Sequence, residues 1–186
     1  NWRNTWNVGA WFQVSWLASA NPTATIHLGP ENTGAYITYF LNGIATKALA
    51  AKTDLTLSGI LAGQVNKLAV FLTRTPNTNR WNKGSNCFTV SGMTVDPASS
   101  AAYIVAARPW GKLVGDDTTE GTSADAGSDN VLSSYAYFLL RGMEAAGYRT
   151  CISACVGSGY ITPGDSMKDV PAFYSVTGSS NGLGGA

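Results

Sequence analysis

The segment "KLVGDDTTEG", Lys112 to Gly121, sets the organisation of the second half of this chain. A short apolar run meets an acidic turn that ends in glycine, and a long segment with helical spacing follows. In α/β enzymes, ligands bind beyond the carboxyl ends of parallel strands, so catalytic groups gather at such strand-to-helix corners. This corner is therefore the first candidate for a functional site.

The sequence on either side of the corner predicts a β-α-β unit. "AAYIVAARPWGKLVGDD" and "RTCISACVG" have strand character, and "SDNVLSSYAYFLLRGMEAAGY" lies between them. The latter predicts a helix near 129–146, capped by Ser128 or Asp129 and stopped by Gly147. Its apolar positions at helical spacing are Val131, Leu132, Tyr135, Phe138, Leu139 and Met143. A strand, a helix and a strand in this order open a parallel α/β sheet.

Residues 1 to about 107 predict an antiparallel β-sandwich or jelly roll. Short strands such as "TATIHLG" and "NKLAVFLTRT" are separated by turn clusters, with no helical pattern between them. "AYITYFLNGIATKAL" predicts a hairpin around Asn42-Gly43, a favoured type I′ pair. We therefore expect two domains, a β-sandwich/jelly-roll domain over 1–107 and a partial α/β domain over 108–186.

The composition argues against nucleic acid and membranes as partners. Charged residues make up 12% of the chain, the formal net charge is +1, and no Lys or Arg adjoins another. Nucleic-acid binding calls for a clustered basic face, and no apolar stretch approaches the roughly 20 residues that span a bilayer. Abundant Gly, Ser, Thr and Asn favour an extracellular, virion-surface or cell-surface protein. The chain begins "NWRNTW" without Met, so we expect a mature or excised part of a longer protein.

The cysteines and the histidine predict no metal site. Cys151 and Cys155 lie four residues apart in one predicted strand, roughly 13 Å, which is too far for a disulfide. Together with Cys87 and the sole histidine, His27, they do not supply the ligands that zinc requires. We expect cysteines that behave as small buried apolar side chains, with at least one thiol free or paired with another chain. His27 is expected to be a partly buried strand residue, and no cofactor is implied.

The corner resembles the first block of the SGNH (GDSL-like) hydrolases, Gly-Asp-Ser-(Ile)-Thr-x-Gly. The residues that match it are Gly115, Asp116, Thr119 and Gly121. The nucleophile position falls on Asp117, where that family has Ser. A helix containing Ser134-Tyr135 then leads to a glycine-centred second block in "ACVGSGY". There Gly157 matches the glycine whose backbone N–H helps to form an oxyanion hole, and Gly159 follows it.

The β half in front of the corner is similar to the jelly roll of the carbohydrate-esterase family 2 type. The resemblance therefore implies an SGNH-type α/β domain of flavodoxin-like, three-layer architecture after the jelly roll, and an esterase that removes acetyl groups from carbohydrate. It implies catalytic positions at Asp117 and Gly157, and substrate-contacting positions at Asp116, Thr119 and Gly159.

Three departures from this pattern bear on activity. The carboxylate of Asp117 cannot perform the Ser-type acyl transfer and would repel an oxyanion. The third block, Gly-x-Asn-Asp, and the terminal Asp-x-x-His are not found in the sequence. We therefore expect an esterase-like module that is inactive or incomplete as this chain. A second Gly-Asp-Ser, at 164–166, follows Pro163 rather than a strand and is treated as coincidental.

Other interpretations remain open at the level of sequence. The acidic turn can be a helix-capping turn with no active site. The whole chain can be a non-catalytic glycan-binding or structural subunit of a surface fibre or phage tail fibre or spike, with carbohydrate and other protein chains as partners, through self-assembly or a continuation chain. Four tryptophans near the start can line a sugar-binding face, but core or interface anchors are favoured; they are Trp2, Trp6, Trp11 and Trp16.

Overall fold

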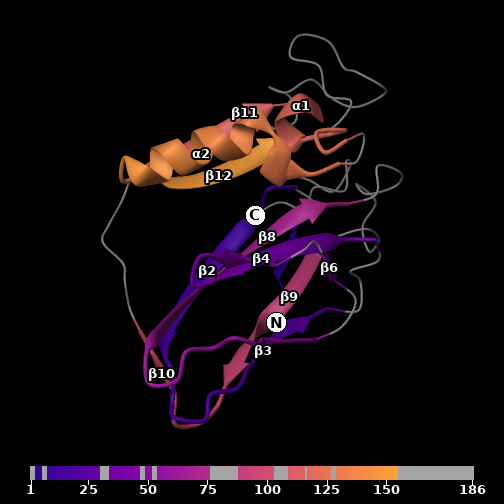
Figure 1. The fold of residues 1–186 in the computed structure, drawn as a ribbon. Coiled ribbons are helices and arrows are strands. Elements are labelled where there is room, and N and C mark those ends of the chain that lie inside the picture. The colour runs from indigo at the N-terminus through magenta and orange to yellow at the C-terminus, as the bar shows by residue number, and fades with distance from the viewer. Residues whose placement is uncertain are drawn as a thin grey trace.

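Two antiparallel β-sheets share a hydrophobic core, and a smaller parallel unit lies at one end of them (Figure 1). The structure is a computed structural model that describes residues 3–5, 8–29, 34–46, 49–51, 54–75, 88–102, 109–115, 117–126 and 129–154. Several residues singled out in the sequence lie outside these ranges: Trp2, Trp6, Cys87, Asp116, Ser128, Cys155, Gly157, Gly159 and 164–166.

The first sheet has the strand order β1-β9-β3-β7. Its strands are β1 (Arg3–Thr5), β3 (Ala24–Leu28), β7 (Leu55–Thr56) and β9 (Phe88–Val95). The second sheet has the order β10-β2-β8-β4-β5, and β6 also pairs with β4. Its strands are β2 (Trp11–Leu17), β4 (Tyr36–Leu41), β5 (Ile44–Ala45), β6 (Leu49–Ala50), β8 (Val65–Arg74) and β10 (Ser100–Ala101). The pairings in both sheets are antiparallel, as expected of a β-sandwich.

Alternating side chains build the shared core. Along β3 the buried Ala24, Ile26 and Leu28 alternate with the partly exposed Thr25 and His27, because successive side chains of a strand point to opposite faces. Both sheets contribute to the core, which includes Trp16, Ile26, Leu28, Ile37, Tyr39, Leu41, Leu68, Val70, Leu72 and Phe88. The core role favoured for the early tryptophans is confirmed at Trp16, which is only 3% exposed.

The hairpin between β4 and β5 turns at Asn42 and Gly43, as predicted. Their φ angles are 53° and 83°, and Leu41 pairs with Ile44 across the turn. A type I′ turn needs positive φ at both central residues, which Asn and Gly tolerate best. Local turn chemistry thus fixes the register of this hairpin.

The second unit is a parallel pair of strands joined by helices, so the predicted β-α-β order is confirmed. Its elements are β11 (Trp110–Gly115), α1 (Asp117–Glu120), η1 (Val131–Ser133), α2 (Tyr135–Ala145) and β12 (Arg149–Ala154). β11 and β12 pair in parallel along their whole length. The assignment of this unit to a larger α/β domain stays a prediction.

The helix prediction is wrong at its start. Helix α2 begins at Tyr135, not near 129, because Ser134 adopts an extended conformation with ψ of 155°. The cap is neither Ser128 nor Asp129: the Ser134 side chain accepts from the Tyr137 backbone N–H at 3.4 Å. The predicted stop is confirmed, since Gly147 has a φ of 93° directly after the last turn.

This break also changes which side of the helix is buried. Helix α2 buries Ala136 and Leu140. Its side chains Tyr135, Phe138 and Leu139 are 54%, 64% and 48% exposed. The extended Ser134 separates the short helix η1 from α2. The apolar spacing that begins at Val131 therefore does not continue on one face of α2.

A separate core holds the second unit together, and the first part of the chain enters it. This core consists of Val8, Val131, Ala136, Leu140 and Ile152. Val8 precedes β2, and Gly9 follows with a φ of 87°; a Cβ at Gly9 would lie 2.8 Å from Cδ1 of Ile152. Trp11 Nε1 also donates to the Thr150 carbonyl at 2.9 Å. The start of β2 is therefore packed against β12.

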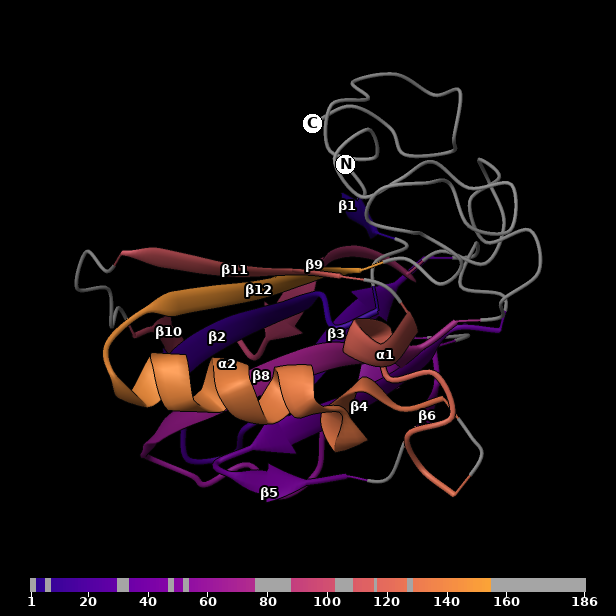
Figure 2. The same cartoon turned by 90° about the horizontal axis from the view of Figure 1, so that it is seen from above.

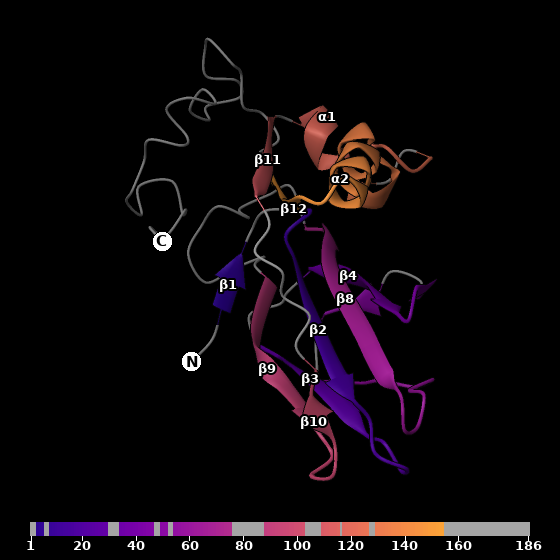
Figure 3. The same ribbon diagram turned by 90° about the vertical axis from the view of Figure 1, so that its left-hand side faces the viewer.

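Viewed from above, α2 runs alongside β12 and over the second sheet (Figure 2). From the side, the β-α-β unit lies at the end of the sandwich, with α2 above the ends of β4 and β8 (Figure 3). No helix in the described ranges is long and apolar enough to cross a bilayer.

Candidate functional site

The acidic corner lies at the carboxyl edge of the two parallel strands. β11 ends at Gly115, α1 begins at Asp117, and Gly115 pairs with Ala154 at the end of β12. The segment after β12 carries the predicted Gly157 and Gly159, which lie outside the described residues together with Asp116. The structure thus places the start of α1 beside the end of β12, the geometry in which α/β proteins bind ligands.

Gly115 is required here by close packing. A Cβ on Gly115 would lie 1.8 Å from Oγ1 and 2.5 Å from Cβ of Thr119, one turn later. Thr119 itself is only 2% exposed. Only glycine therefore fits at position 115 in a turn as tight as this one.

Hydrogen bonds fasten α1 to the beginning of α2. The hydroxyl groups of Thr119 and Tyr135 are 2.8 Å apart. Ser134 Oγ donates toward the Val131 carbonyl at 2.7 Å and lies 3.5 Å from the Thr119 carbonyl. These bonds connect the corner to the segment from which α2 starts. The predicted substrate contact at Thr119 stays a prediction.

A compact turn closes the corner on its other side. Gly121 has a φ of 84°, and a Cβ there would lie 2.6 Å from the Asn130 carbonyl oxygen. Asn130 in turn donates its backbone N–H to the Gly121 carbonyl at 2.9 Å. Ser123 donates its backbone N–H to Asp129 at 2.9 Å, and the Asn130 side chain donates to Asp125 at 3.2 Å. The two block glycines, 115 and 121, are therefore both sterically required.

The sole histidine is not at this corner. His27 lies on β3 of the first sheet, where Nδ1 is 2.7 Å from Asp54 and Nε2 is 2.6 Å from Thr94 Oγ1. The side-chain hydrogen bond from His27 holds the pKa of the Asp54 carboxyl below its usual value. The expectation of a strand position for His27 is confirmed, and its two ring nitrogens both have partners there.

No group of three or more metal-binding side chains occurs in the described part of the chain. Cys151 is a free, half-buried thiol on β12, and burial raises its pKa. Such a thiol is weakly nucleophilic at neutral pH, because the thiolate is the reactive form. In the described ranges the corner therefore consists of tightly packed backbone and of hydroxyl groups.

Sequence reasoning missed the link between Thr119 and Tyr135. Tyr135 occupies an apolar position of the helical pattern, but its hydroxyl group bonds to Thr119 in the corner. Ser134 directly before an apolar helical run was the available signal, because Ser is a preferred N-cap and so marks where α2 begins. Tyr135 then falls in the first turn, next to the corner.

Comparisons with known proteins point to one group of folds. The sequence matches no protein-family model, and no curated protein matches it. Among solved structures, the chain is similar to a carbohydrate esterase family 2 enzyme with a carbohydrate-binding domain from Corynascus thermopiles (Myceliophthora fergusii). That similarity has 16% identity and a TM-score of 0.64, over 94% of this chain and 53% of that one.

Two further structures give the same result. A family two carbohydrate esterase from Clostridium thermocellum in complex with cellohexaose has 17% identity and a TM-score of 0.63, over 95% of this chain and 54% of that one. An acetyl xylan esterase from Butyrivibrio proteoclasticus has 13% identity and a TM-score of 0.64, over 87% and 45%. At such identities the likeness establishes the fold, and the chain spans about half the length of these proteins.

Proposed function

We propose that this chain is an esterase-like carbohydrate module that binds acetylated glycan at the Asp117 corner and does not hydrolyse it as a 186-residue chain. The observation that supports this most is the corner itself. A glycine that admits no side chain, a helix beginning at the nucleophile position and a parallel strand ending beside it are assembled in a fold shared with carbohydrate esterases.

The proposal includes the organisation expected from the sequence. Residues 1–107 form the jelly-roll domain, and 108–186 form the opening of an SGNH-type α/β domain. Asp116, Thr119 and Gly159 contact the substrate, and Gly157 contributes an oxyanion-hole N–H. A protein that recognises glycans in this way acts outside the cell or at a cell or virion surface.

The chemistry explains the expected lack of turnover. In Ser-type ester hydrolysis a hydroxyl attacks the carbonyl carbon, and a histidine takes its proton and gives it to the leaving alcohol. The Asp117 carboxylate has no proton to transfer, and its attack would give an anhydride rather than an ester. No histidine follows it in the sequence. Position 117 therefore lacks the hydroxyl nucleophile, and the sequence that follows it lacks the histidine base.

An activity assay and a binding assay test the two halves of the proposal. The chain and its Asp117→Ser variant should show no turnover of an activated acetyl ester, whereas Asp117→Ser in a longer chain carrying a downstream Asp-x-x-His should. Acetylated xylohexaose should bind the chain, and Asp117→Trp should abolish the binding by filling the corner. Hydrolysis by the 186-residue chain that Ser166→Ala removes and Asp117→Ala does not affect would place the site elsewhere.

A non-catalytic structural subunit of a surface fibre or phage tail fibre is the second candidate. It is favoured by the exposed apolar side chains of α2, Tyr135, Phe138 and Leu139, which would be covered in an assembly. The two-stranded parallel sheet also invites pairing with further strands. Light scattering should then detect an oligomer of this chain; a monodisperse monomer would contradict the assembly.

A further inference from the structure

Three polar side chains stand in a row across the outer face of the first sheet. In the strand order β3 lies between β9 and β7, and it carries His27. Thr94 lies on β9, where it pairs with Thr25 of β3, and Asp54 directly precedes β7 on the other side. Thr25 and His27 alternate with the buried residues of β3, so the row lies on the face opposite the sandwich core.

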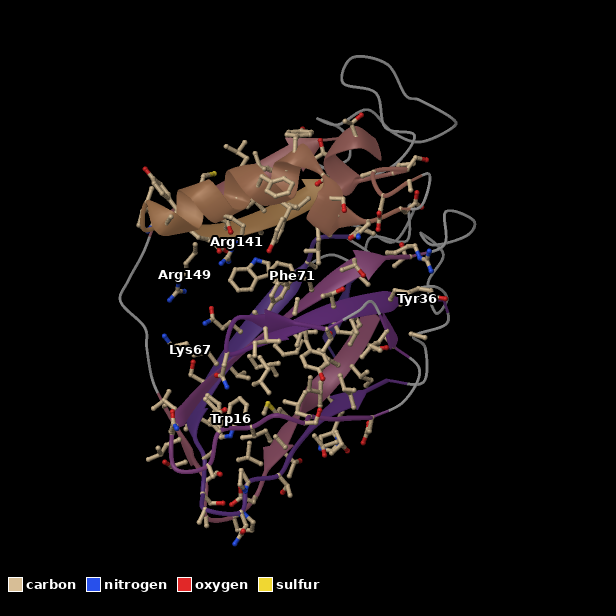
Figure 4. The ribbon with its side chains drawn as sticks, in the orientation of Figure 1. Trp16, Tyr36, Lys67, Phe71, Arg141 and Arg149 are labelled. Atoms are coloured by element: carbon tan, nitrogen blue, oxygen red, sulfur yellow. The ribbon has the colours of Figure 1, made fainter. Side chains whose placement is uncertain are left out.

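This outer face is accessible to small molecules. It lies on the side of the sandwich away from β4 and β8 (Figure 3), and the core with Trp16 of β2 lies behind it (Figure 4). The side chains of His27 and Asp54 are 36% and 53% exposed, and Thr94 is exposed as well. Gly92 pairs with His27, and a Cβ there would have no atom of the described residues within 4 Å, its chain neighbours aside. Space therefore remains beside the imidazole.

The hydrogen bonds fix the direction in which a proton moves along the row. Nδ1 of His27 is 2.7 Å from Oδ2 of Asp54, and Nε2 is 2.6 Å from Oγ1 of Thr94. An ionised carboxylate only accepts, so Nδ1 carries the proton of the neutral imidazole and Nε2 accepts from the Thr94 hydroxyl. The second carboxylate oxygen, Oδ1, accepts from the Leu28 backbone N–H at 3.1 Å. The carboxylate is thus itself held in place.

The row has the order of a nucleophile, a base and a positioning carboxylate. A hydroxyl, an imidazole and a carboxylate bonded in this order activate the hydroxyl for attack on a carbonyl carbon. The base must lie about 2.6–3.2 Å from the oxygen whose proton it takes, and both contacts of His27 meet that requirement. Polar side chains also pair across strands for stability alone, so the reactivity of Thr94 distinguishes the two roles.

We infer that Thr94 accepts the acyl group of a small activated ester, with His27 as general base and Asp54 as the residue that positions the imidazole. Oγ1 of Thr94 forms a bond to the carbonyl carbon, and its proton passes to Nε2 of His27. The bond between that carbon and the leaving-group oxygen then breaks, and the leaving phenol or alcohol takes up the proton. Thr94 is left carrying the acyl group.

The open surface restricts the donor and the outcome. An exposed sheet face offers little area to bind a long substrate, so the donor must carry a leaving group that departs as a stable anion, as the phenolate of an aryl ester does. The acylated Thr94 is an alkyl ester, whose alkoxide is a much poorer leaving group. The inference is therefore a modification without turnover, and it does not rest on the proposed function at the corner.

Incubation of the 186-residue chain with 4-nitrophenyl acetate, followed by peptide mapping in a mass spectrometer, tests this inference. Mapping is needed because lysine side chains also react with this ester. Thr56 serves as the internal reference, since it is exposed, lies on β7 and pairs with Thr25. Thr94 should be acetylated at least about tenfold faster than Thr56, because a positioned base contributes about 10²–10⁴-fold. Released phenolate should equal the bound acetyl groups once uncatalysed hydrolysis is subtracted.

Substitutions assign the three roles. His27→Gln should slow acetylation of Thr94 by about 10²-fold or more. Asp54→Asn should slow it by at least about tenfold, because an amide can donate to Nδ1 and so hold the imidazole in the wrong tautomer. Thr94→Ser should remain reactive at that position. Thr56→Val, the matched control, should leave acetylation of Thr94 unchanged, and urea unfolding of each variant confirms that it is folded.

Several results would overturn the inference. They are an unmodified Thr94, equal rates at Thr94 and Thr56, and an unchanged rate at Thr94 in the folded His27→Gln variant. An unchanged rate in Asp54→Asn would remove the positioning role of Asp54. Phenolate release that continues past the bound acetyl groups and disappears in Thr94→Val would also overturn it, because Thr94 would then pass its acyl group to water.

Discussion

Replacing Gly115 with Ala should destabilise the chain strongly, although the change adds one methyl group. The new Cβ would overlap three atoms of the buried Thr119, the farthest of them 2.9 Å away. Overpacking a filled site costs about 1–3 kcal/mol, and displacing Thr119 from Tyr135 adds about 1 kcal/mol for the lost hydrogen bond. We expect the free energy of unfolding to fall by about 2–4 kcal/mol. With a urea m-value of about 2 kcal/mol/M, the midpoint moves down by about 1–2 M.

Gly111→Ala on the same strand is the matched control. Its Cβ would meet Cε of Met143, the end of a flexible side chain that can rotate away. That variant should lose less than about 1 kcal/mol. Thr119→Gly removes all three clashing atoms, so Gly115→Ala should cost little more in that background, giving a coupling of at least about 1 kcal/mol. Equal effects of the two alanine substitutions, or strict additivity with Thr119→Gly, would refute the close packing of the corner.

Three further predictions concern the rest of the chain. Leu140→Ala should lower the free energy of unfolding by about 2–4 kcal/mol and Phe138→Ala by less than about 1 kcal/mol in urea titrations, because Leu140 is 4% exposed and Phe138 64%; the reverse order would mean that α2 buries its other face. Asn66→Ala should cost about 1–3 kcal/mol by the same assay, since the buried Asn66 amide accepts from Leu61 and donates to two backbone carbonyls; a neutral result would show that water replaces it. The hydrogen bond between Asp54 and His27 lowers the folded-state pKa of Asp54 below 3.8. The stability that this carboxylate provides is therefore present above about pH 4, and it is lost as the pH falls through the lowered pKa. Thermal melts between pH 6 and pH 2 should show a smaller acid-dependent decrease for Asp54→Asn, and an unchanged slope would count against this pair.

Patterns that depend on neighbouring residues were visible in the sequence. The alternation in β3 and the Asn42-Gly43 pair each follow from local geometry, so the sandwich strands and one register could be predicted. Gly147 marked the end of α2 for the same reason. The sequence also located the corner, because an apolar strand, an acidic turn and a helix follow one another within the chain.

Features that depend on tertiary contacts could not be predicted in this way. The phase of α2 changes at Ser134 through a cap whose partner is one turn away, and an unbroken helical pattern conceals that change. The contact of Thr119 with Tyr135 spans 16 residues. Likewise, the partners of His27 become known only when β9 is placed beside β3, because Thr94 lies 67 residues further along the chain.

The insertion of Val8 into the core of the second unit has a consequence for biosynthesis. Trp11 bonds to Thr150 across 139 residues, and Val8 and Gly9 pack against Ile152, so the ribosome must add most of the chain before the start of β2 acquires these contacts. At roughly 5–20 residues per second that takes about 7–28 s. Throughout this interval the nascent polypeptide presents an unburied apolar segment, and a chaperone acting on it would have to remain bound until Ile152 emerges from the exit tunnel.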